Sequence, residues 1–130
     1  MLRNSFFTTV SIPEVSDKIN TEKSIIFNVE ININPDHKIF KGHFPEQPIV
    51  PGVVYIEMIR EIMEIVFEQE FLIKEASNIK FLSITNPLIN TNLHFEFNII
   101  KKDEELISVK VIISSENGAV IKFDGKFLNK

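Results

Sequence analysis

Apolar and polar positions alternate along two stretches near the start of the chain, at residues 6–12 and 23–33. In the second stretch, one face of an extended chain would carry five apolar side chains: Ile25, Phe27, Val29, Ile31 and Ile33. Alternation with a period of two is typical of strands that bury one face. Both stretches therefore predict strands, and the polar residues 16–22 between them predict a turn.

The pattern changes at residues 34–51, which contain four of the six prolines of the chain. Prolines at this density exclude a helix or a paired strand, so the segment predicts a stiff loop. Pro51 suits the entry to a helix, and the residues from Val53 to about Phe71 predict a helix of about five turns. Later segments rich in Ile, Phe and Val predict four more strands, at 78–85, 92–101, 106–114 and 119–128.

These elements predict an α+β fold in which an antiparallel sheet wraps around one long helix. The chain has 130 residues, the length of one ordinary domain, so a single domain over 1–130 is expected. With 44% apolar and 25% charged residues, the composition is typical of a folded globule rather than a disordered chain.

Composition also narrows the chemistry. The absence of cysteine excludes disulfides, thiolate metal sites and a cysteine nucleophile. A net charge of −4 argues against nucleic-acid binding, and no apolar run approaches the roughly 20 residues that span a membrane. The first residues lack the apolar core of a secretory signal, which makes the cytoplasm the expected location. No metal-binding or phosphate-binding spacing is present, so we expect acid–base chemistry without a cofactor or a metal.

His43 and Glu57 are the candidate acid–base residues. His43 lies in the proline-rich loop, and imidazole titrates near neutral pH, so it can act as a general base. Glu57 falls in the first turns of the predicted helix, and in a dry site near Glu61 it would favour the protonated form that a general acid needs. A structural or surface role for His43 stays open. So does a solvated stripe of glutamates at helical spacing, comprising Glu57, Glu61, Glu64 and Glu68.

Gly52 is the third candidate, because a glycine at a helix start lets a ligand approach free backbone N–H groups. A thioester carbonyl that gains negative charge would suit this place. The alternative is that Gly52 only eases the loop into the helix. His37 is expected to end a strand and His94 to lie within one, and neither receives a role.

The segment from 36 to 57 resembles the 3-hydroxyacyl-acyl-carrier-protein dehydratases of the hot-dog superfamily. The residues that match are His43-Phe44-Pro45, Pro48, Pro51-Gly52-Val53 and Glu57. The order of strands and the single long helix also fit the hot-dog fold over nearly the whole chain. The resemblance implies that an acyl carrier protein presents a 3-hydroxyacyl thioester, which loses water to form a trans-2-enoyl thioester.

The resemblance also implies roles for individual residues. His43 would take the C2 proton, Glu57 would help the C3 hydroxyl to leave, and the Gly52 amide would polarise the carbonyl. Phe44, Pro51 and Val53 would position the substrate. The facing His43 and Glu57 would come from different subunits of a homodimer, with a heterodimer or a higher oligomer as alternatives.

Some positions depart from the family pattern: Glu46 replaces a common glycine, Glu61 replaces a glutamine, and Pro87-Leu88-Ile89 replaces Pro-Gly-Asp. These departures indicate a divergent member, such as one that serves a polyene or other secondary lipid pathway. Two alternatives to the dehydratase are a hot-dog acyl thioesterase and a non-catalytic subunit that binds acyl chains or completes a heterodimer. An acidic carrier would need a local basic patch, for which the candidates are Lys38, Lys41, Lys80, Lys101 and Lys102.

Overall fold

The computed structural model describes residues 2–11, 24–42, 50–83, 86, 91–102 and 106–129, with no side chain described at positions 11, 41, 42, 101 and 102. The strands are β1 (Phe7–Ser11), β2 (Ile25–Ile33), β3 (Phe71–Phe81), β4 (Asn92–Lys102), β5 (Leu106–Ser115) and β6 (Gly118–Asn129). The helices are α1 (Ile39–Gly42) and α2 (Gly52–Phe67). All six strands form one sheet in the order β1-β2-β4-β5-β6-β3, and each paired neighbour is antiparallel.

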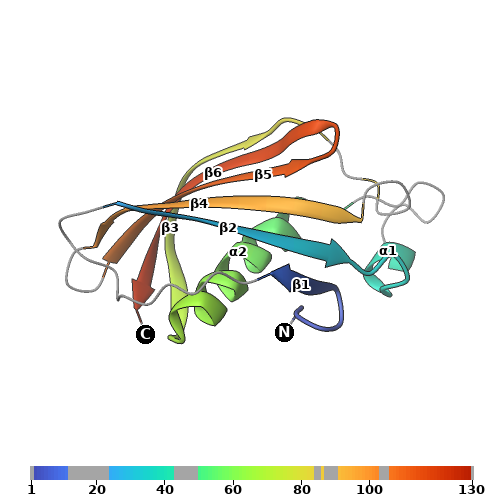
Figure 1. The fold of residues 1–130 in the computed structure, drawn as a ribbon, viewed down its shortest axis with the longest axis horizontal. Coiled ribbons are helices and arrows are strands. Elements are labelled where there is room, and N and C mark those ends of the chain that lie inside the picture. Colours follow the sequence, from blue (N-terminus) through green and yellow to red (C-terminus); the bar gives the residue numbers. More distant parts are fainter. Residues whose placement is uncertain are drawn as a thin grey trace.

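The sheet curves over α2, which lies along one of its faces (Figure 1). Alternation along the strands explains this arrangement, because every second side chain of β2 and of β5 is buried. The helix contributes an apolar side to the same core, which includes Val54, Met58, Ile59 and Ile62. An antiparallel sheet around one helix confirms the predicted α+β class and the hot-dog architecture.

Helix α2 ends earlier than the sequence predicted. Its last helical residue is Phe67, and Glu68 adopts a left-handed conformation with φ 53°. The chain then reverses, and the amide of Phe71 donates a hydrogen bond of 2.8 Å to the Glu64 carboxylate. The expected helical extension to Phe71 is therefore wrong, and β3 begins at that residue instead of at residue 78. The helical pattern of the sequence continues into residues 68–71, but the reversal of the chain there depends on the hydrogen bond between Phe71 and Glu64.

Two further boundaries differ from expectation. The loop expected over 34–51 contains the short helix α1, so its described part is not wholly irregular. Strand β2 ends at Ile33, and His37 lies beyond the strand, where its Nδ1 accepts a hydrogen bond of 3.1 Å from the Ile39 amide. His37 therefore belongs to the turn that leads into α1. The other strands are confirmed, with small shifts at their ends, and His94 lies in β4 as expected.

Strand β3 is an edge strand of the sheet, and most of its side chains are exposed. Among the described strands it pairs only with β6, and its side chains from Leu72 to Phe81 are exposed or half-buried. Two irregularities in the register interrupt the pairing, between Ile73 and Glu75 and between Ala76 and Asn78. A long edge strand presents unpaired backbone groups that another chain can use.

Candidate active site

The start of α2 presents backbone N–H groups beside Pro51 and Gly52. Pro51 precedes the helix in an extended conformation (φ −63°, ψ 144°), and no side-chain cap is present among the described residues. The Val54 amide closes the first turn with a bond of 3.0 Å to the Pro51 carbonyl. The first N–H groups of a helix lack partners within it and carry its partial positive charge, so they favour an anionic or polarised oxygen.

The ring of Phe81, at the end of β3, lies against Gly52. A Cβ added to Gly52 would be 2.7 Å from Cζ and 2.8 Å from Cε1 of that ring. Glycine is therefore the residue that permits this close approach. Phe81 is 59% exposed, so the ring borders solvent and does not belong to the core. Sequence reasoning gave Phe81 no role, because spacing along β3 gives no signal that its end reaches the helix start.

Apolar side chains are unusually exposed at this end of the molecule. Val53 is 74% exposed and Leu82 is 49% exposed, while Pro51 is half-buried. Together with Phe81 they surround the helix start with apolar surface. Such a surface can receive an acyl chain or a second protein chain.

Glu57 lies five residues after Gly52 on the same helix and is held by Arg60. The Arg60 Nε donates to both carboxylate oxygens of Glu57, at 3.1 and 3.2 Å, and its Nη2 completes the ion pair. The Glu57 side chain is 38% exposed. In the single chain it is therefore a solvent-accessible, paired carboxylate and not a residue of a dry site.

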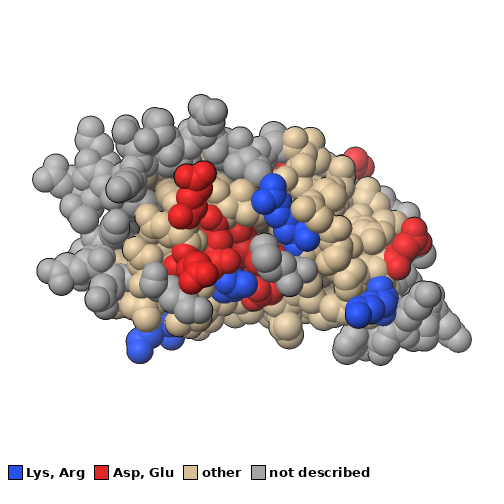
Figure 2. All heavy atoms as spheres, turned by 90° about the horizontal axis from the view of Figure 1, so that it is seen from below, with Lys and Arg blue, Asp and Glu red and all other residues tan. Residues whose placement is uncertain are grey.

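Arg60 also forms an ion pair of 2.8 Å with Glu64. The hydrogen bonds that Arg60 donates to Glu57, together with the charges of Glu57 and Glu64, raise the pKa of Arg60 above its ordinary value, although partial burial opposes the shift. Acidic side chains gather over α2 on the face seen in Figure 2, with a basic side chain among them. Arg60 thus remains a permanent cation between two glutamates.

Glu61 points away from this group and is buried, with 1% of its surface exposed. Its carboxylate accepts hydrogen bonds from the Leu2 amide at 3.0 and 2.9 Å and from the Arg3 amide at 3.1 Å. The idea of one solvated glutamate stripe is therefore wrong for Glu61. Its buried carboxylate fixes the N-terminal segment against the helix.

His43, Phe44 and Glu46 lie outside the described residues, as do Pro87-Leu88-Ile89. The described residues on either side of the His43 loop are well buried: Phe40 is 5% exposed and Val50 is 6% exposed. Phe40 packs against Phe6, with ring centroids 5.5 Å apart, and the His37 ring meets Phe6 edge-on at 5.3 Å. Both ends of the loop are thus fixed in the core.

The described residues contain no cluster of three or more His, Cys, Asp or Glu side chains that could hold a metal ion. Among them there is also no helix long and apolar enough to cross a membrane. Of the candidate lysines, Lys38 is exposed after β2 and Lys80 is exposed on β3, whereas the side chains of Lys41, Lys101 and Lys102 lie outside the described part.

An antiparallel sheet that wraps one central helix, with the helix start beside an edge strand, defines a hot-dog protein. A family model described as ApeI-like, ApeI dehydratase, matches residues 17–122. The chain therefore belongs to the ApeI-like dehydratase family.

Individual relatives agree with this assignment. The chain is 26% identical over 121 residues to the 3-hydroxyacyl-(acyl-carrier-protein) dehydratase FabZ of Rickettsia typhi, covering 87% of this chain and 82% of that protein. The structure of the dehydratase heterocomplex ApeI:P from Xenorhabdus doucetiae matches with a TM-score of 0.62 at 21% identity, covering 80% of this chain and 88% of that chain. A putative thioesterase from Lactococcus lactis matches with a TM-score of 0.61 at 12% identity, covering 95% and 88%. The two structural matches show the fold alone.

Proposed function

We propose that this protein is an enzyme that removes water from 3-hydroxyacyl thioesters carried by an acyl carrier protein and forms trans-2-enoyl thioesters. The observation that carries the proposal is the helix start at Gly52, which no described side chain caps, with Glu57 further along the same helix, in a chain of a dehydratase family. A polarised carbonyl and a nearby acid suit removal of a β-hydroxyl group.

In the proposed reaction, His43 removes the proton from C2 of the substrate. The C2–H electron pair forms the C2=C3 double bond, the C3–O bond breaks, and Glu57 supplies the proton with which the hydroxyl leaves as water. The Gly52 N–H stabilises the negative charge that develops on the thioester oxygen. Phe44, Pro51 and Val53 position the acyl group. No redox partner is needed, since the products are the enoyl thioester and water.

A homodimer would complete this site, with His43 of one subunit facing Glu57 of the other. The open edge of β3 and the exposed Val53, Phe81 and Leu82 support self-association at this end of the molecule. In the single chain Glu57 is paired with Arg60, and acting as an acid requires it to take up a proton. Closure of the subunit interface over Glu57 would exclude water, and burial disfavours the charged form of a carboxylate. We place the enzyme in the cytoplasm.

The test is conversion of a short 3-hydroxyacyl carrier thioester, followed by mass spectrometry as the loss of one water. Wild type is compared with His43→Ala and Glu57→Gln, with folding checked by circular dichroism. We expect turnover by the wild type and loss of it in both variants. Absence of water loss from wild type across several chain lengths would refute the proposal.

Two alternatives have distinct readouts. The similarity in fold to a putative thioesterase favours hydrolysis as the second candidate, and hydrolysis would release a free thiol without an enoyl product. A non-catalytic subunit would be monomeric when purified alone, by light scattering, and would gain activity only with an active homologue. The heterocomplex formed by the similar ApeI:P pair is the observation that favours this third candidate.

A further inference from the structure

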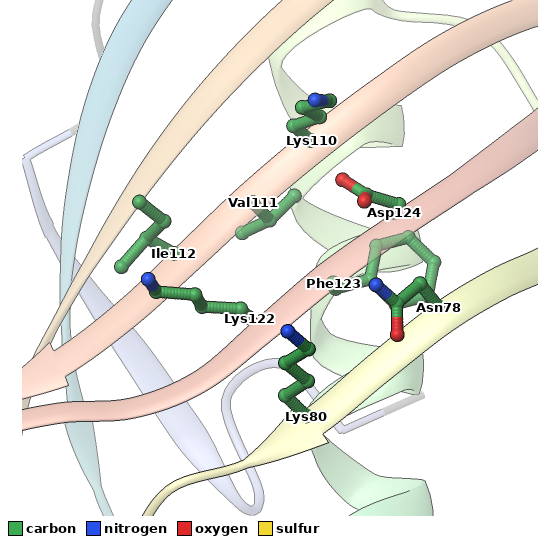
Figure 3. A pocket seen from close by; sticks show the side chains of 8 residues that line it. All are labelled: Asn78, Lys80, Lys110, Val111, Ile112, Lys122, Phe123 and Asp124. Carbon is green, nitrogen blue, oxygen red and sulfur yellow. The ribbon is translucent and has the colours of Figure 1, made fainter.

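A basic hollow lies on the outer face of the sheet, opposite the face that covers α2 (Figure 3). It has a volume of about 230 Å³ and spans β3, β5 and β6. Three exposed lysines line it, Lys80 on β3, Lys110 on β5 and Lys122 on β6, together with Asn78 and Asp124. Three cations against one carboxylate give this hollow a positive charge, although the chain as a whole carries −4.

The register explains why the lysines gather there. Lys80 and Lys122 are directly opposite each other across β3 and β6, and both project to the outer face. Lys110 is opposite Asp124, two residues further along β6. Like charges directly opposite in an antiparallel pair destabilise it. None of the three lysines forms an ion pair within the described part of the chain. An anionic partner would offset this repulsion.

The hollow fits several carboxylates on a protein surface better than one phosphate group. The lysines come from three strands, and β3 lies about 10 Å from β5 because adjacent strands are about 4.8 Å apart. Their amino groups are spread around the hollow and do not converge on one point (Figure 3). The hollow has no arginine fork and no helix start, and β6 at its centre is hydrogen-bonded on both sides. An arginine fork, a helix start and free backbone N–H groups are the features with which proteins usually bind a phosphate.

The hollow also lies close to the proposed active site. Lys80 directly precedes Phe81, and successive side chains of a strand point to opposite faces. Phe81 contacts Gly52 on the inner side, while Lys80 faces outward at the same end of β3. A partner docked on Lys80 would therefore lie next to the end of β3. A flexible acyl-bearing arm on that partner could pass around this end and reach the helix start.

We propose that Lys80, Lys110 and Lys122 form the docking surface for the acidic carrier protein that delivers the thioester. The identification of the partner as the carrier rests on the proposed function. The outer face turns acidic on the far strands, with exposed Glu30 on β2 and Glu96 on β4. An acidic partner is repelled there and is directed to the β3 side of the sheet.

The experiment compares wild type with Lys80→Glu, Lys110→Glu and Lys122→Glu on two substrates. One is the short 3-hydroxyacyl thioester on its carrier, and the other is the same acyl group on N-acetylcysteamine, which lacks the carrier. Lys74→Glu is the matched control, since Lys74 is exposed on β3 but does not line the hollow. We expect each hollow variant to lower kcat/KM for the carrier substrate by about tenfold at low salt, and less at high salt. The hollow variants should turn over the carrier-free substrate at the wild-type rate, and the control variant should turn over both substrates at the wild-type rate.

Direct binding of the deacylated carrier, by fluorescence anisotropy, separates this proposal from the proposed function. Weaker carrier binding by the hollow variants supports the docking surface even if wild type dehydrates nothing. Equal loss on both substrates, or carrier binding unchanged by all three reversals, overturns it. It is also overturned if the reversals change the molecular mass by light scattering, since a second copy would then occupy the hollow. The proposal is likewise overturned, in favour of a small-anion site, if inorganic phosphate displaces the carrier more strongly than chloride does at the same ionic strength.

Discussion

The buried carboxylate of Glu61 supports a prediction that can be worked out from its contacts. It accepts three hydrogen bonds, of 2.9 to 3.1 Å, from two backbone amides of the N-terminal segment. Hydrogen bonds to a charged group contribute about 1.5–3 kcal/mol each. Leu2 and Arg3 are only half-buried, so water can partly replace the lost acceptor. We therefore expect Glu61→Ala to lower the free energy of unfolding by about 2–4 kcal/mol.

The amide variant Glu61→Gln is a sharper probe. It keeps the size of the side chain and one acceptor oxygen, but it turns an NH₂ group toward amides that can only donate. We expect a loss of about 1–2 kcal/mol, about half that of the alanine variant. The melting temperature should fall by roughly 3–5 °C for each kcal/mol in a chain of this size.

The assay is thermal and urea unfolding at one fixed protein concentration, because self-association shifts apparent stability. Glu70→Gln, on an exposed glutamate just before β3, is the control and should unfold like wild type. Hydrogen exchange should also speed up at the amides of Leu2 and Arg3. If Glu61→Ala melted within about 1 °C of wild type, the carboxylate would not fix the N-terminal segment and the reasoning would be refuted.

Three other substitutions test separate contacts. Gly125→Ala places a Cβ 2.7 Å from the backbone oxygen of Glu75, which cannot move aside as a side chain could. We expect it to lower the free energy of unfolding, measured in urea, by about 1–3 kcal/mol, and an unchanged free energy would contradict the geometry. Gly52→Ala places a Cβ 2.7 Å from the exposed ring of Phe81, so a double-mutant cycle with Phe81→Ala should give a coupling of about 0.5–1 kcal/mol, and simple additivity would argue against the contact. Arg60→Met loses two partly exposed ion pairs, for about 1 kcal/mol. The pKa of Arg60 is raised in the folded protein, so the stabilisation that Arg60 provides is fully present below its unfolded-state pKa and is lost only at higher pH. Arg60→Met should therefore leave the slope of the unfolding free energy against pH unchanged from pH ~7 to ~9.

Much of the fold could be predicted from local pattern. The alternation in β2, and the segments that became β4, β5 and β6, identified strands because one face of each had to be apolar. The end of α2 could not be predicted in this way. Residues 68–71 continue the helical pattern, and the left-handed Glu68 and the bond from Phe71 to Glu64 appear only when β3 folds back.

The candidate site was predictable in part for the same reason. The spacing from Pro51 to Glu57 lies within one helix, so the sequence could place Gly52 and Glu57 on neighbouring turns. Nothing local indicated that Phe81 would cover Gly52. The ion pair of Arg60 with Glu57, by contrast, is an i,i+3 contact of the kind that helical spacing favours. The pairing of His43 with Glu57 remains a prediction.

By itself, the sequence determined the class of the fold, the single long helix and the segment that carries the family resemblance, because these depend on residues two to four positions apart or on one continuous motif. Only the tertiary structure decided that Glu61 is buried against amides 58 and 59 residues away, and that Lys80 lies opposite Lys122. It also decided that β3 is an edge strand. Strand order, register and burial are set by packing of the whole chain, which local periodicity does not encode.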